Sequence, residues 1–393
     1  MEITMAANLH LFLSRIQHET RLVKEARATL AMRVFSRVRV LGLWDHGLPV
    51  RDVDPCGMEV RRVRTLLGFV RARFPSLQPG PLTQVYAGLS FLQYAFAAAW
   101  QALVLRPSHI SCHNAVLLPI AWFAAKLGGS KLVYVPHELE VERTGLSLNA
   151  KRFEAPLERA LIKRCALVVV VSEPIAAWYR QRYQLREVVV VRAIPDSGFA
   201  PGHSADRARI RASHGVPADA LLFIYQGVLA AERGVDDLVQ IFRRSNNPRL
   251  HLMLMGYGEA EARIQEAAAQ CPNIHFQAAV PVDQICRYTA AADVGIFVLR
   301  DPLSLSYRLC LPNKFFEYLY AELPVIVSDN LSHLAELVQE HRIGWVTRPE
   351  DLPQLIDTIE AGGIVSIKPA VKDFVARNTW ASERSRYTVV YGG

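Results

Sequence analysis

The sequence predicts an α/β protein that contains two doubly wound parallel sheets in tandem. Short β-branched runs alternate with longer amphipathic runs along the chain, a pattern typical of parallel α/β architecture. A segment rich in proline and glycine, residues 195–217, interrupts this alternation near the middle of the chain. The length of 393 residues also exceeds what one hydrophobic core usually supports. We therefore expect a first domain over residues 1–195 and a second over residues 196–371.

In the first domain, the β-branched runs predict strands and the amphipathic runs predict helices between them. The expected strands are 3–6, 38–43, 60–63, 109–113, 132–135, 167–172 and 188–194, and the expected helices are 20–31, 82–105, 115–127, 152–164 and 173–183. Two apolar stretches, 88–105 and 115–127, raise the question of a membrane span. Polar residues interrupt the first, and the second is shorter than the roughly 20 residues that a bilayer requires. We expect both to be buried helices.

The second domain repeats the alternation after a linker that contains a basic helical segment at 206–214. The expected strands are 221–226, 250–255, 274–277, 294–298, 324–328 and 344–346, and the expected helices are 234–244, 259–270, 282–291, 313–320, 331–340 and 352–361. Ligands of doubly wound sheets bind at the carboxyl ends of the strands. We therefore expect the two domains to face each other across a cleft that holds the site.

Composition restricts the partners and the compartment. The net charge of +8 and the pI of about 9.2 favour an anionic partner, such as nucleotide phosphates, an acidic membrane surface or nucleic acid. Aromatic residues in the basic segment 61–74 are too few for a nucleic-acid stacking platform, so we expect no nucleic acid. The six cysteines are far apart, which predicts neither a disulfide framework nor a zinc site. The first residues lack the pattern of a signal peptide, and we expect a cytoplasmic protein.

The most informative motif is the stretch 312–329, PNKFFEYLYAELPVIVSD. A polar Pro312-Asn313-Lys314 loop precedes a predicted helix, and the free N–H groups of a helix N-terminus suit an anion. Lys314 adds a cation, and Glu317 adds an acceptor for sugar hydroxyls. The alternative is a solvated Lys-Glu pair, because residues three apart share a helix face. We interpret the motif as a site for a sugar attached to a diphosphate.

Two glycine-containing strand ends of the second domain also suggest a ligand. Gln226 and Gly227 end the first predicted strand, where glycine permits close backbone approach, and Arg233 follows as a side chain suited to phosphate. Gly256 follows the second strand in a half-match to the dinucleotide fingerprint. Acidic Glu259 lies where a pyrophosphate would bind, and residues 7–20 contain no glycine, so a dehydrogenase is disfavoured.

In the first domain, polar pairs follow two predicted strands. His137 and Glu138 follow one strand, and His113 and Asn114 end the preceding one, which directs them toward the expected cleft. Neither pair has metal-ligand spacing, and no acidic cluster accompanies them, so we expect no metal. The basic and apolar segment 61–74 could lie on an anionic bilayer; the alternative is a strand followed by a solvated helix.

These segments together resemble the GT-B glycosyltransferases, specifically the large retaining family 4, over nearly the whole chain. The matching segments are 14–26, 134–139 (YVPHEL), 158–173, 191–195 (VRAIP), 225–234 and, most specifically, 312–318 (PNKFFEY).

The resemblance implies roles for individual residues and for the domains. Glu317 would hold the donor ribose, Arg233 the donor diphosphate, and His137 would lie near the transferred sugar. Backbone near residues 279–280 would lie by the nucleobase, and the C-terminal segment 372–393 would return to the first domain. The expected catalytic residues are His137, Arg233, Lys314 and Glu317; donor-binding residues Gln226, Gly227, Gly256, Val280, Pro312 and Asn313; and acceptor-side residues His113, Asn114 and Glu138.

The resemblance also implies an activity. It is transfer of a sugar from a nucleotide diphosphate sugar to an acceptor hydroxyl with retention, without a metal or cofactor. The acceptor would be a saccharide or lipid-linked precursor in polysaccharide or glycolipid biosynthesis, at the cytoplasmic face of an anionic membrane.

Three departures from the family pattern leave other functions open. Leu309 stands where the first glutamate of the family's E-x7-E motif is expected, Val228 replaces an arginine, and the N-terminal loop lacks its usual glycines. A catalytically silent nucleotide-sugar-binding protein and a GT-B sugar epimerase are the alternatives.

Overall fold

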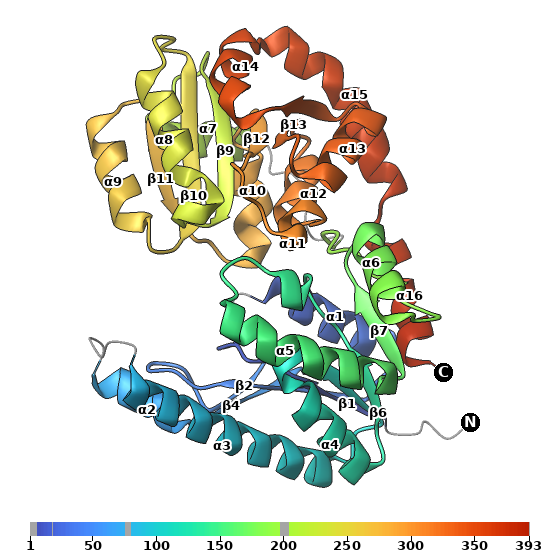
Figure 1. The fold of residues 1–393 in the computed structure, drawn as a ribbon. Helices are drawn as coiled ribbons and strands as arrows, with labels where there is room; N and C mark the ends of the chain where they lie inside the picture. Colours follow the sequence, from blue (N-terminus) through green and yellow to red (C-terminus); the bar gives the residue numbers. More distant parts are fainter. Residues whose placement is uncertain (1–5, 18, 75–79, 197–203, 393) are drawn as a thin grey trace. The chain divides into compact units, whose positions relative to one another are not determined.

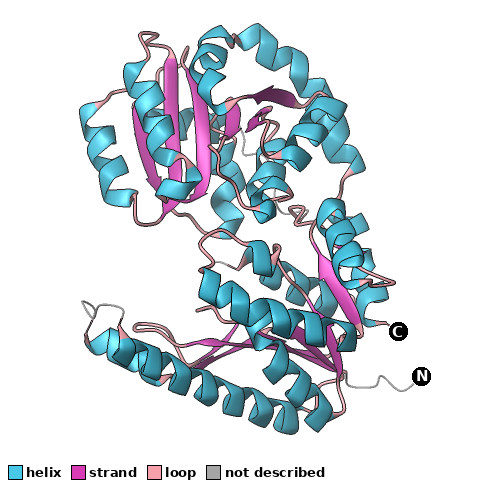
Figure 2. Ribbon diagram, in the orientation of Figure 1, coloured by secondary structure: helices cyan, strands magenta, loops and turns pink. Residues whose placement is uncertain are grey.

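The computed structural model describes residues 6–17, 19–74, 80–196 and 204–392, which form two compact units. The first unit comprises Met1–Arg192 with Glu383–Gly393, and the second comprises Ala193–Ser382. Figure 1 follows the chain through both units, and Figure 2 shows that each is a sheet flanked by helices. The fold class expected from the sequence, two doubly wound α/β domains, is confirmed.

The first unit is built on an eight-stranded sheet in the order β3-β4-β2-β1-β5-β6-β7-β8. Neighbouring strands are parallel except β3, which pairs antiparallel with β4 at one edge. The order reverses between β1 and β5, so the carboxyl ends of these strands form a switch point of the kind where α/β proteins bind ligands. The strands are β1 Ala7–Leu11, β2 Arg37–Leu43, β3 Arg51–Val53, β4 Glu59–Val63, β5 His109–Cys112, β6 Lys131–Tyr134, β7 Leu167–Val170 and β8 Val189–Val190.

The helices of this unit are α1 Thr20–Ala31, α2 Leu66–Arg73, α3 Pro81–Leu105, α4 Leu118–Gly128, α5 Leu148–Leu161, α6 Glu173–Tyr183 and the C-terminal α16 Trp380–Tyr391. Hydroxyls of Thr65, Ser147 and Ser172 cap α2, α5 and α6 by accepting a bond from a backbone N–H three residues later. α16 packs on the sheet through Tyr391, whose ring contacts Phe35 and His109.

The first strand is displaced from its predicted position. The sequence predicted a strand at 3–6, but β1 spans Ala7–Leu11, and residues 3–5 lie outside the described residues. Leu9 and Leu11 are fully buried, as in any central strand, and the polar Asn8 and His10 are equally buried. These two polar side chains form hydrogen bonds inside the unit. In the sequence they interrupt the apolar run that would have predicted the strand.

The prediction that residues 88–105 form a buried helix is wrong. The buried residues of α3 are Ser90, Tyr94, Ala98, Gln101 and Ala102, and most of its large apolar side chains are exposed. Among the helices of the described residues, α3 alone is long and apolar enough to cross a membrane by length and composition. The second apolar stretch forms a short 3-10 turn and α4, which buries several of its apolar residues as expected.

The second unit is built on a six-stranded parallel sheet in the order β11-β10-β9-β12-β13-β14. Counted from β9, this is the Rossmann order 3-2-1-4-5-6, with its switch point between β9 and β12. The strands are β9 Leu221–Val228, β10 Leu250–Tyr257, β11 Ile274–Ala278, β12 Val294–Phe297, β13 Val325–Ser328 and β14 Gly344–Thr347.

Helices of the second unit share one hydrophobic core with this sheet. They are α7 Ser204–Ser213, α8 Val235–Arg244, α9 Glu261–Gln270, α10 Ile285–Thr289, α11 Leu305–Arg308, α12 Asn313–Tyr320, α13 Ser332–His341, α14 Leu352–Thr358 and α15 Ala361–Arg377. The basic helix expected in the linker is α7, and residues 197–203 of the linker lie outside the described residues. Val371 and Phe374 of α15 belong to this core, so the chain joins the first unit at Glu383 rather than at the expected residue 372.

Candidate functional site

The first turn of α12 holds a buried cation at the switch point of the second sheet. The helix begins at Asn313, with Pro312 as an N-cap that offers no side-chain hydrogen bond. The amine of buried Lys314 lies 3.9 Å from the ring centre of Tyr225 and 4.6 Å from that of Phe297. These rings belong to β9 and β12, the strands that flank the switch point. The sequence-predicted segment 312–314 therefore lies where ligands of Rossmann-like sheets bind.

Glycine is needed at two paired positions of β9 and β10 beside the Lys314 amine. Gly227 has φ +123°, and a Cβ there would lie 3.3 Å from Lys314 Nζ, so glycine leaves room for the amine. Gly256 pairs with Gly227 across β9 and β10, and its Cβ would lie 1.8 Å from the Gly227 carbonyl oxygen. The glycine at 256 thus has a packing reason of its own, and its donor-binding role stays a prediction.

Arg233 supplies a second cation to the same region. It ends a 3-10 turn, Ala231–Arg233, and Gly234 follows at φ +71°, where a Cβ would lie 2.8 Å from the Val298 carbonyl oxygen just past β12. The guanidinium lies 4.8 Å from the ring centre of Tyr307, and its buried Nε has no hydrogen-bond partner among the described residues.

The two cations repel one another. Burial first, and then the positive charge of Arg233, lower the pKa of Lys314 well below its ordinary value, while Glu317 opposes the shift. Within the described part of the chain, the Lys314 amine forms no hydrogen bond or ion pair with another residue. Neighbouring cations without a bound counter-charge are a suitable binding site for an anion.

Glu317 is held on the β9 side of the same helix. Its carboxylate is buried and accepts a 2.6 Å hydrogen bond from Gln226 Nε2, while Thr289 Oγ1 donates to Gln226 Oε1 over 2.7 Å. The backbone N–H of Gln226 donates to the hydroxyl of Tyr318, also on α12. The structure therefore brings together Gln226 and Glu317, two residues that the sequence placed in one site.

Val280 of the predicted donor site follows a different strand, and the two departures from the family pattern, Val228 and Leu309, lie at the ends of β9 and α11. Val280 follows β11, which β10 separates from β9, and its side chain packs partly buried against the core. Val228 ends β9 and is exposed. Leu309, at the position of the expected glutamate, is the C-cap of the short helix α11.

In the first unit, three histidines form a line at the switch point. His113 follows β5, His137 follows β6, and His10 lies on β1. His10 Nδ1 is 2.9 Å from His113 Nε2, and His113 Nδ1 is 3.0 Å from His137 Nε2. The structure therefore joins His113 and His137, which the sequence predicted separately, and adds His10, which it did not.

Asn8 determines which nitrogen of each histidine ring carries the proton. Its amide Nδ2 donates to His10 Nε2 over 3.0 Å, so each ring in turn carries its proton on Nδ1 and donates to the next ring. Burial lowers the pKa of His10 to about 3, and it lowers those of His113 and His137 well below the ordinary value, so all three rings are neutral. The last ring, His137, keeps an N–H at Nδ1 to offer to another group.

The line continues in the opposite direction to the C-terminal helix. Asn8 also exchanges hydrogen bonds with Ser111 Oγ, which lies 2.9 Å from the Tyr391 hydroxyl, and that hydroxyl donates to Glu25. Burial raises the pKa of Glu25 to about 7, against the effects of the Tyr391 bond and Arg21. A continuous buried polar chain thus connects α1 and α16 with His137.

One part of this chain has the composition of a metal site. His10, Glu25 and His113 offer ligand atoms that all lie within 4.8 Å of one another. However, the two histidine nitrogens bond to each other, and Arg21 already lies within electrostatic range of Glu25. The group therefore fits a hydrogen-bonded chain better than a cation.

The remaining acceptor-side predictions have local partners. Asn114 Oδ1 accepts a 3.0 Å bond from the Leu13 N–H, which joins the ends of β5 and β1. Arg21 Nη1 donates to the His137 carbonyl oxygen over 3.0 Å, and Glu138 is half-buried beside it, within electrostatic range of Arg21.

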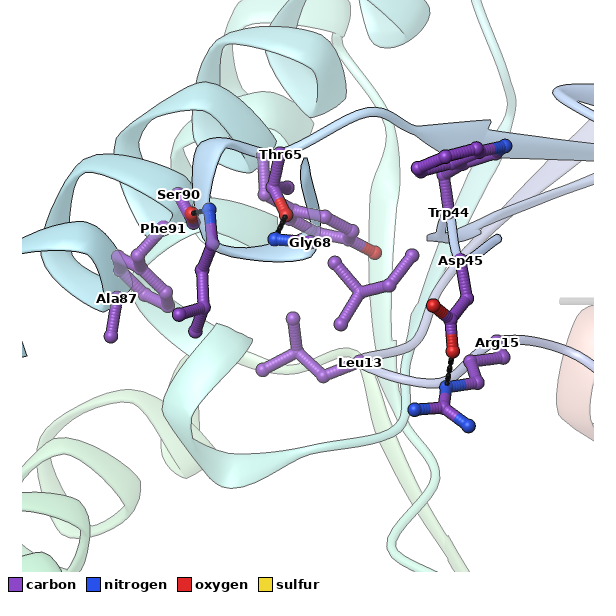
Figure 3. Close-up of a pocket in the computed structure, with 12 residues that line it drawn as sticks. Leu13, Arg15, Trp44, Asp45, Thr65, Gly68, Ala87, Ser90 and Phe91 are labelled. Atoms are coloured by element: carbon purple, nitrogen blue, oxygen red, sulfur yellow. Dashed lines mark hydrogen bonds and ion pairs between the residues drawn. The ribbon is translucent and has the colours of Figure 1, made fainter. Parts of the chain in front are cut away.

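A pocket of about 250 Å³ lies near the carboxyl ends of β1, β2 and β4. Its lining, shown in Figure 3, combines apolar side chains such as Leu13 and Phe91 with an Arg15–Asp45 ion pair of 2.8 Å. Residues of both α2 and α3 contribute to the wall, and Ser90 of α3 accepts a hydrogen bond from the Leu67 N–H of α2. An apolar space with charges at one end suits an amphiphilic ligand.

Sequence reasoning missed several residues that complete these sites. The aromatic rings around the cations come from core strands and α11, and the buried polar chain includes residues more than 300 positions apart. A His at alternate positions with buried leucines, as in the NLHL of β1, was the one local signal that could have revealed His10.

Two Rossmann-like units with an anion-binding arrangement at the switch point of the second are the architecture of the GT-B glycosyltransferases. Solved structures share this fold across the whole chain. Sucrose-phosphate synthase from Thermosynechococcus elongatus is 17% identical with a TM-score of 0.72, and the alignment covers 98% of each chain. Anabaena HepE in complex with UDP and glucose is 16% identical with a TM-score of 0.72, covering 98% of this chain and 99% of that one. WaaG, a glycosyltransferase involved in lipopolysaccharide biosynthesis, is 15% identical with a TM-score of 0.67, covering 98% and 100%.

Family models identify the protein more closely. The model described as glycosyltransferase family 4 matches residues 48–195, and the one described as glycosyl transferases group 1 matches residues 220–361. The chain belongs to this family of glycosyltransferases, as its sequence motifs predicted. No curated protein sequence matches it.

Proposed function

We propose that this glycosyltransferase takes its sugar from a nucleoside diphosphate sugar and retains the configuration of the anomeric carbon. The observation that carries the donor assignment is the pair of cations at the switch point of the second sheet, Lys314 and Arg233, with no counter-charge bound to the lysine among the described residues. A diphosphate would neutralise both, and the first N–H groups of α12 would add donors. HepE, a protein of the same fold, has been crystallised with UDP-glucose, which favours a uridine nucleotide.

The chemistry needs a stabilised leaving group. As the C1–O bond to the diphosphate breaks, charge accumulates on the phosphate oxygens, and Arg233 and Lys314 would stabilise it in a reaction proposed to need no metal. Glu317 would bind the ribose hydroxyls, with Gln226 fixing its carboxylate. Further donor contacts are assigned to Gly227, Gly256, Val280, Pro312 and Asn313.

Retention is assigned to attack on the same face of the sugar. The acceptor oxygen forms its bond to C1 as the phosphate leaves, and a phosphate oxygen takes the acceptor proton, so no protein nucleophile is required. His137 would orient the sugar by donating from Nδ1, a tautomer that Asn8, His10 and His113 support. His113, Asn114 and Glu138 complete the acceptor side.

The acceptor is proposed to be a saccharide or lipid-linked precursor of a polysaccharide or glycolipid, used on the cytoplasmic side of the membrane. The pocket of about 250 Å³ in the first unit, which has an apolar lining and the Arg15–Asp45 pair at one end (the amphiphilic pocket), supports this class of acceptor. A solved neighbour, WaaG, acts in lipopolysaccharide biosynthesis.

The test compares Glu317→Ala and Arg233→Ala with the control Arg263→Ala, an exposed arginine that pairs with Asp236 on the same unit. A thermal-shift screen of UDP-, GDP- and dTDP-sugars first identifies the donor. Each site variant should lower turnover at least about 100-fold while keeping its fold, which circular dichroism checks, because each removes a charged contact to the donor. Near-normal turnover by both site variants refutes the assignment. Donor binding without any turnover in the unaltered protein indicates a silent binding protein, as Leu309 and Val228 first suggested, and altered sugar without acceptor indicates an epimerase.

A further inference from the structure

The helix α3 has its polar and apolar sides inverted relative to a soluble protein. Its buried side is polar or small, whereas a row of large apolar residues faces outward, including Phe96 at 75% exposure and Trp100 at 56%. Residues of this row recur every three or four positions and so form one continuous face. They are Leu82, Val85, Leu89, Leu92, Phe96, Trp100, Leu103 and Val104. Contiguous apolar surface of this length on a soluble protein marks a binding surface.

The polar side of α3 is fixed to the domain. The Tyr94 hydroxyl donates to the Leu41 carbonyl oxygen over 2.7 Å, and Gln101 Oε1 accepts a 2.7 Å bond from Arg39. Ser90 accepts from the Leu67 N–H. A helix that crossed a bilayer would lose these bonds and bury the polar side chains in hydrocarbon. The helix therefore lies on the surface of the domain with its apolar face available.

The charged residues of the helices that form this face have a single sign. The sequences of α2, α3 and α4, which pack side by side, contain no aspartate or glutamate. Exposed cations lie nearby: Arg73 at the end of α2, Arg106 directly after α3, and Lys126 on α4. An apolar face with basic residues around it matches the interface of an anionic bilayer, where tryptophan also concentrates.

We propose that the exposed face of α3, flanked by α2 and α4, docks on an anionic membrane surface with α3 lying in the interfacial plane. A second copy of the chain is the less favoured occupant. In a two-fold interface the second copy would present the same face, whose three helices contain no acidic residue to pair with these cations, whereas acidic headgroups would neutralise them. The basic segment 61–74, which includes α2, contributes its exposed Phe69 to this surface.

The surface also explains the position of the amphiphilic pocket. Phe91 and Ala87 of α3 line this pocket, so docking of α3 brings it to the level of the headgroups. A lipid-linked acceptor could then enter while its lipid tail stays in the bilayer. This last step rests on the proposed acceptor class, but docking itself does not.

The experiment measures binding to vesicles without donor or acceptor, so that its failure is distinct from failure of the proposed reaction. The full chain is sedimented with phosphatidylcholine vesicles, with or without phosphatidylglycerol, at low and high salt. We compare Phe96→Asp with the matched control Phe153→Asp, which alters a phenylalanine of 60% exposure on α5. Circular dichroism checks that both variants fold, and light scattering reports their oligomeric state.

We expect binding to phosphatidylglycerol vesicles that weakens with salt, a loss of about ten-fold or more for Phe96→Asp, and none for Phe153→Asp. No binding at low salt overturns the proposal, and so does an equal loss in both variants. A dimer without lipid that Phe96→Asp dissociates would instead assign the face to a second copy.

Discussion

The substitution Lys314→Met tests whether the protein retains a destabilising charge for the sake of its donor. The lysine amine is buried between two aromatic rings, and burial together with Arg233 lowers its pKa well below the ordinary value. Methionine has a similar length and no charge, so it fills the space without the repulsion. In the absence of donor the variant should therefore be as stable as the unaltered protein, or more stable by about 1 kcal/mol or more.

The effect on catalysis should have the opposite sign. A charged hydrogen bond to a phosphate contributes about 1.5–3 kcal/mol, which corresponds to a roughly 10- to 150-fold loss of kcat/KM. The pH dependence follows from the lowered pKa of Lys314. Between its folded pKa and the unfolded value of 10.5, the unfolded chain binds more protons, so stability rises with pH across this window. Lys314→Met should lack that rise.

Two measurements on the same samples test the predicted gain in stability and loss of activity: urea unfolding at several pH values, and initial rates with the donor that the thermal-shift screen selects. The matched control is Lys372→Met, which alters an exposed lysine paired with Glu322 in the same unit and should change neither quantity. The reasoning is refuted if Lys314→Met destabilises the protein by several kcal/mol, as a packing defect would, or if it keeps near-normal kcat/KM.

Two further substitutions test the buried polar chain and the contact of the C-terminal helix α16 with Arg192. For Glu25 the folded pKa of about 7 exceeds the ordinary 4.5, so the folded state binds more protons between these values and stability falls as pH rises through them. Glu25→Gln should therefore gain about 2–3 kcal/mol of stability relative to the unaltered protein between pH 5 and pH 8, and urea unfolding that shows no such gain contradicts the assignment. Glu383 is fully buried and accepts three bonds of 2.7–3.0 Å from Arg192. Glu383→Gln should lose about 2–4 kcal/mol in the same assay, and a loss below about 0.5 kcal/mol would show that the pair contributes little.

The sequence predicted most of the fold because continuous apolar runs identify buried parallel strands. β9, β10, β11 and β12 begin at the predicted residues, and α1, α6 and α12 match from end to end. The ends of β9 and β10 were underpredicted, since glycines that weaken a strand signal continue the pairing there. β3 was missed because its three residues are exposed and carry no apolar pattern.

The candidate site was predictable where polar and charged side chains lie at the carboxyl edge of a parallel sheet. Lys314, Arg233, Gln226 and Glu317 could be placed together because parallel strands bring their carboxyl ends to one edge of a sheet. The environment of those groups could not be predicted, since the lowered pKa of Lys314 depends on rings from other strands. The buried polar chain of the first unit could not be predicted either, because the bonds of Tyr391 to Ser111 and Glu25 depend on tertiary packing alone.

The error over α3 has a physical meaning that goes beyond prediction. Hydropathy reports that a segment avoids water, but it does not say whether protein or another apolar phase replaces the water. Here protein covers only a polar or small side of the helix, and two hydrogen bonds hold that side in place: Tyr94 donates to Leu41, and Gln101 accepts from Arg39. Folding alone gains little from the exposed row, because surface polar residues would keep the same bonds and improve solubility. The row therefore indicates a second apolar surface that the folded protein meets, and the exposed cations on and beside α2, α3 and α4, which contain no acidic residue, indicate that this surface is acidic.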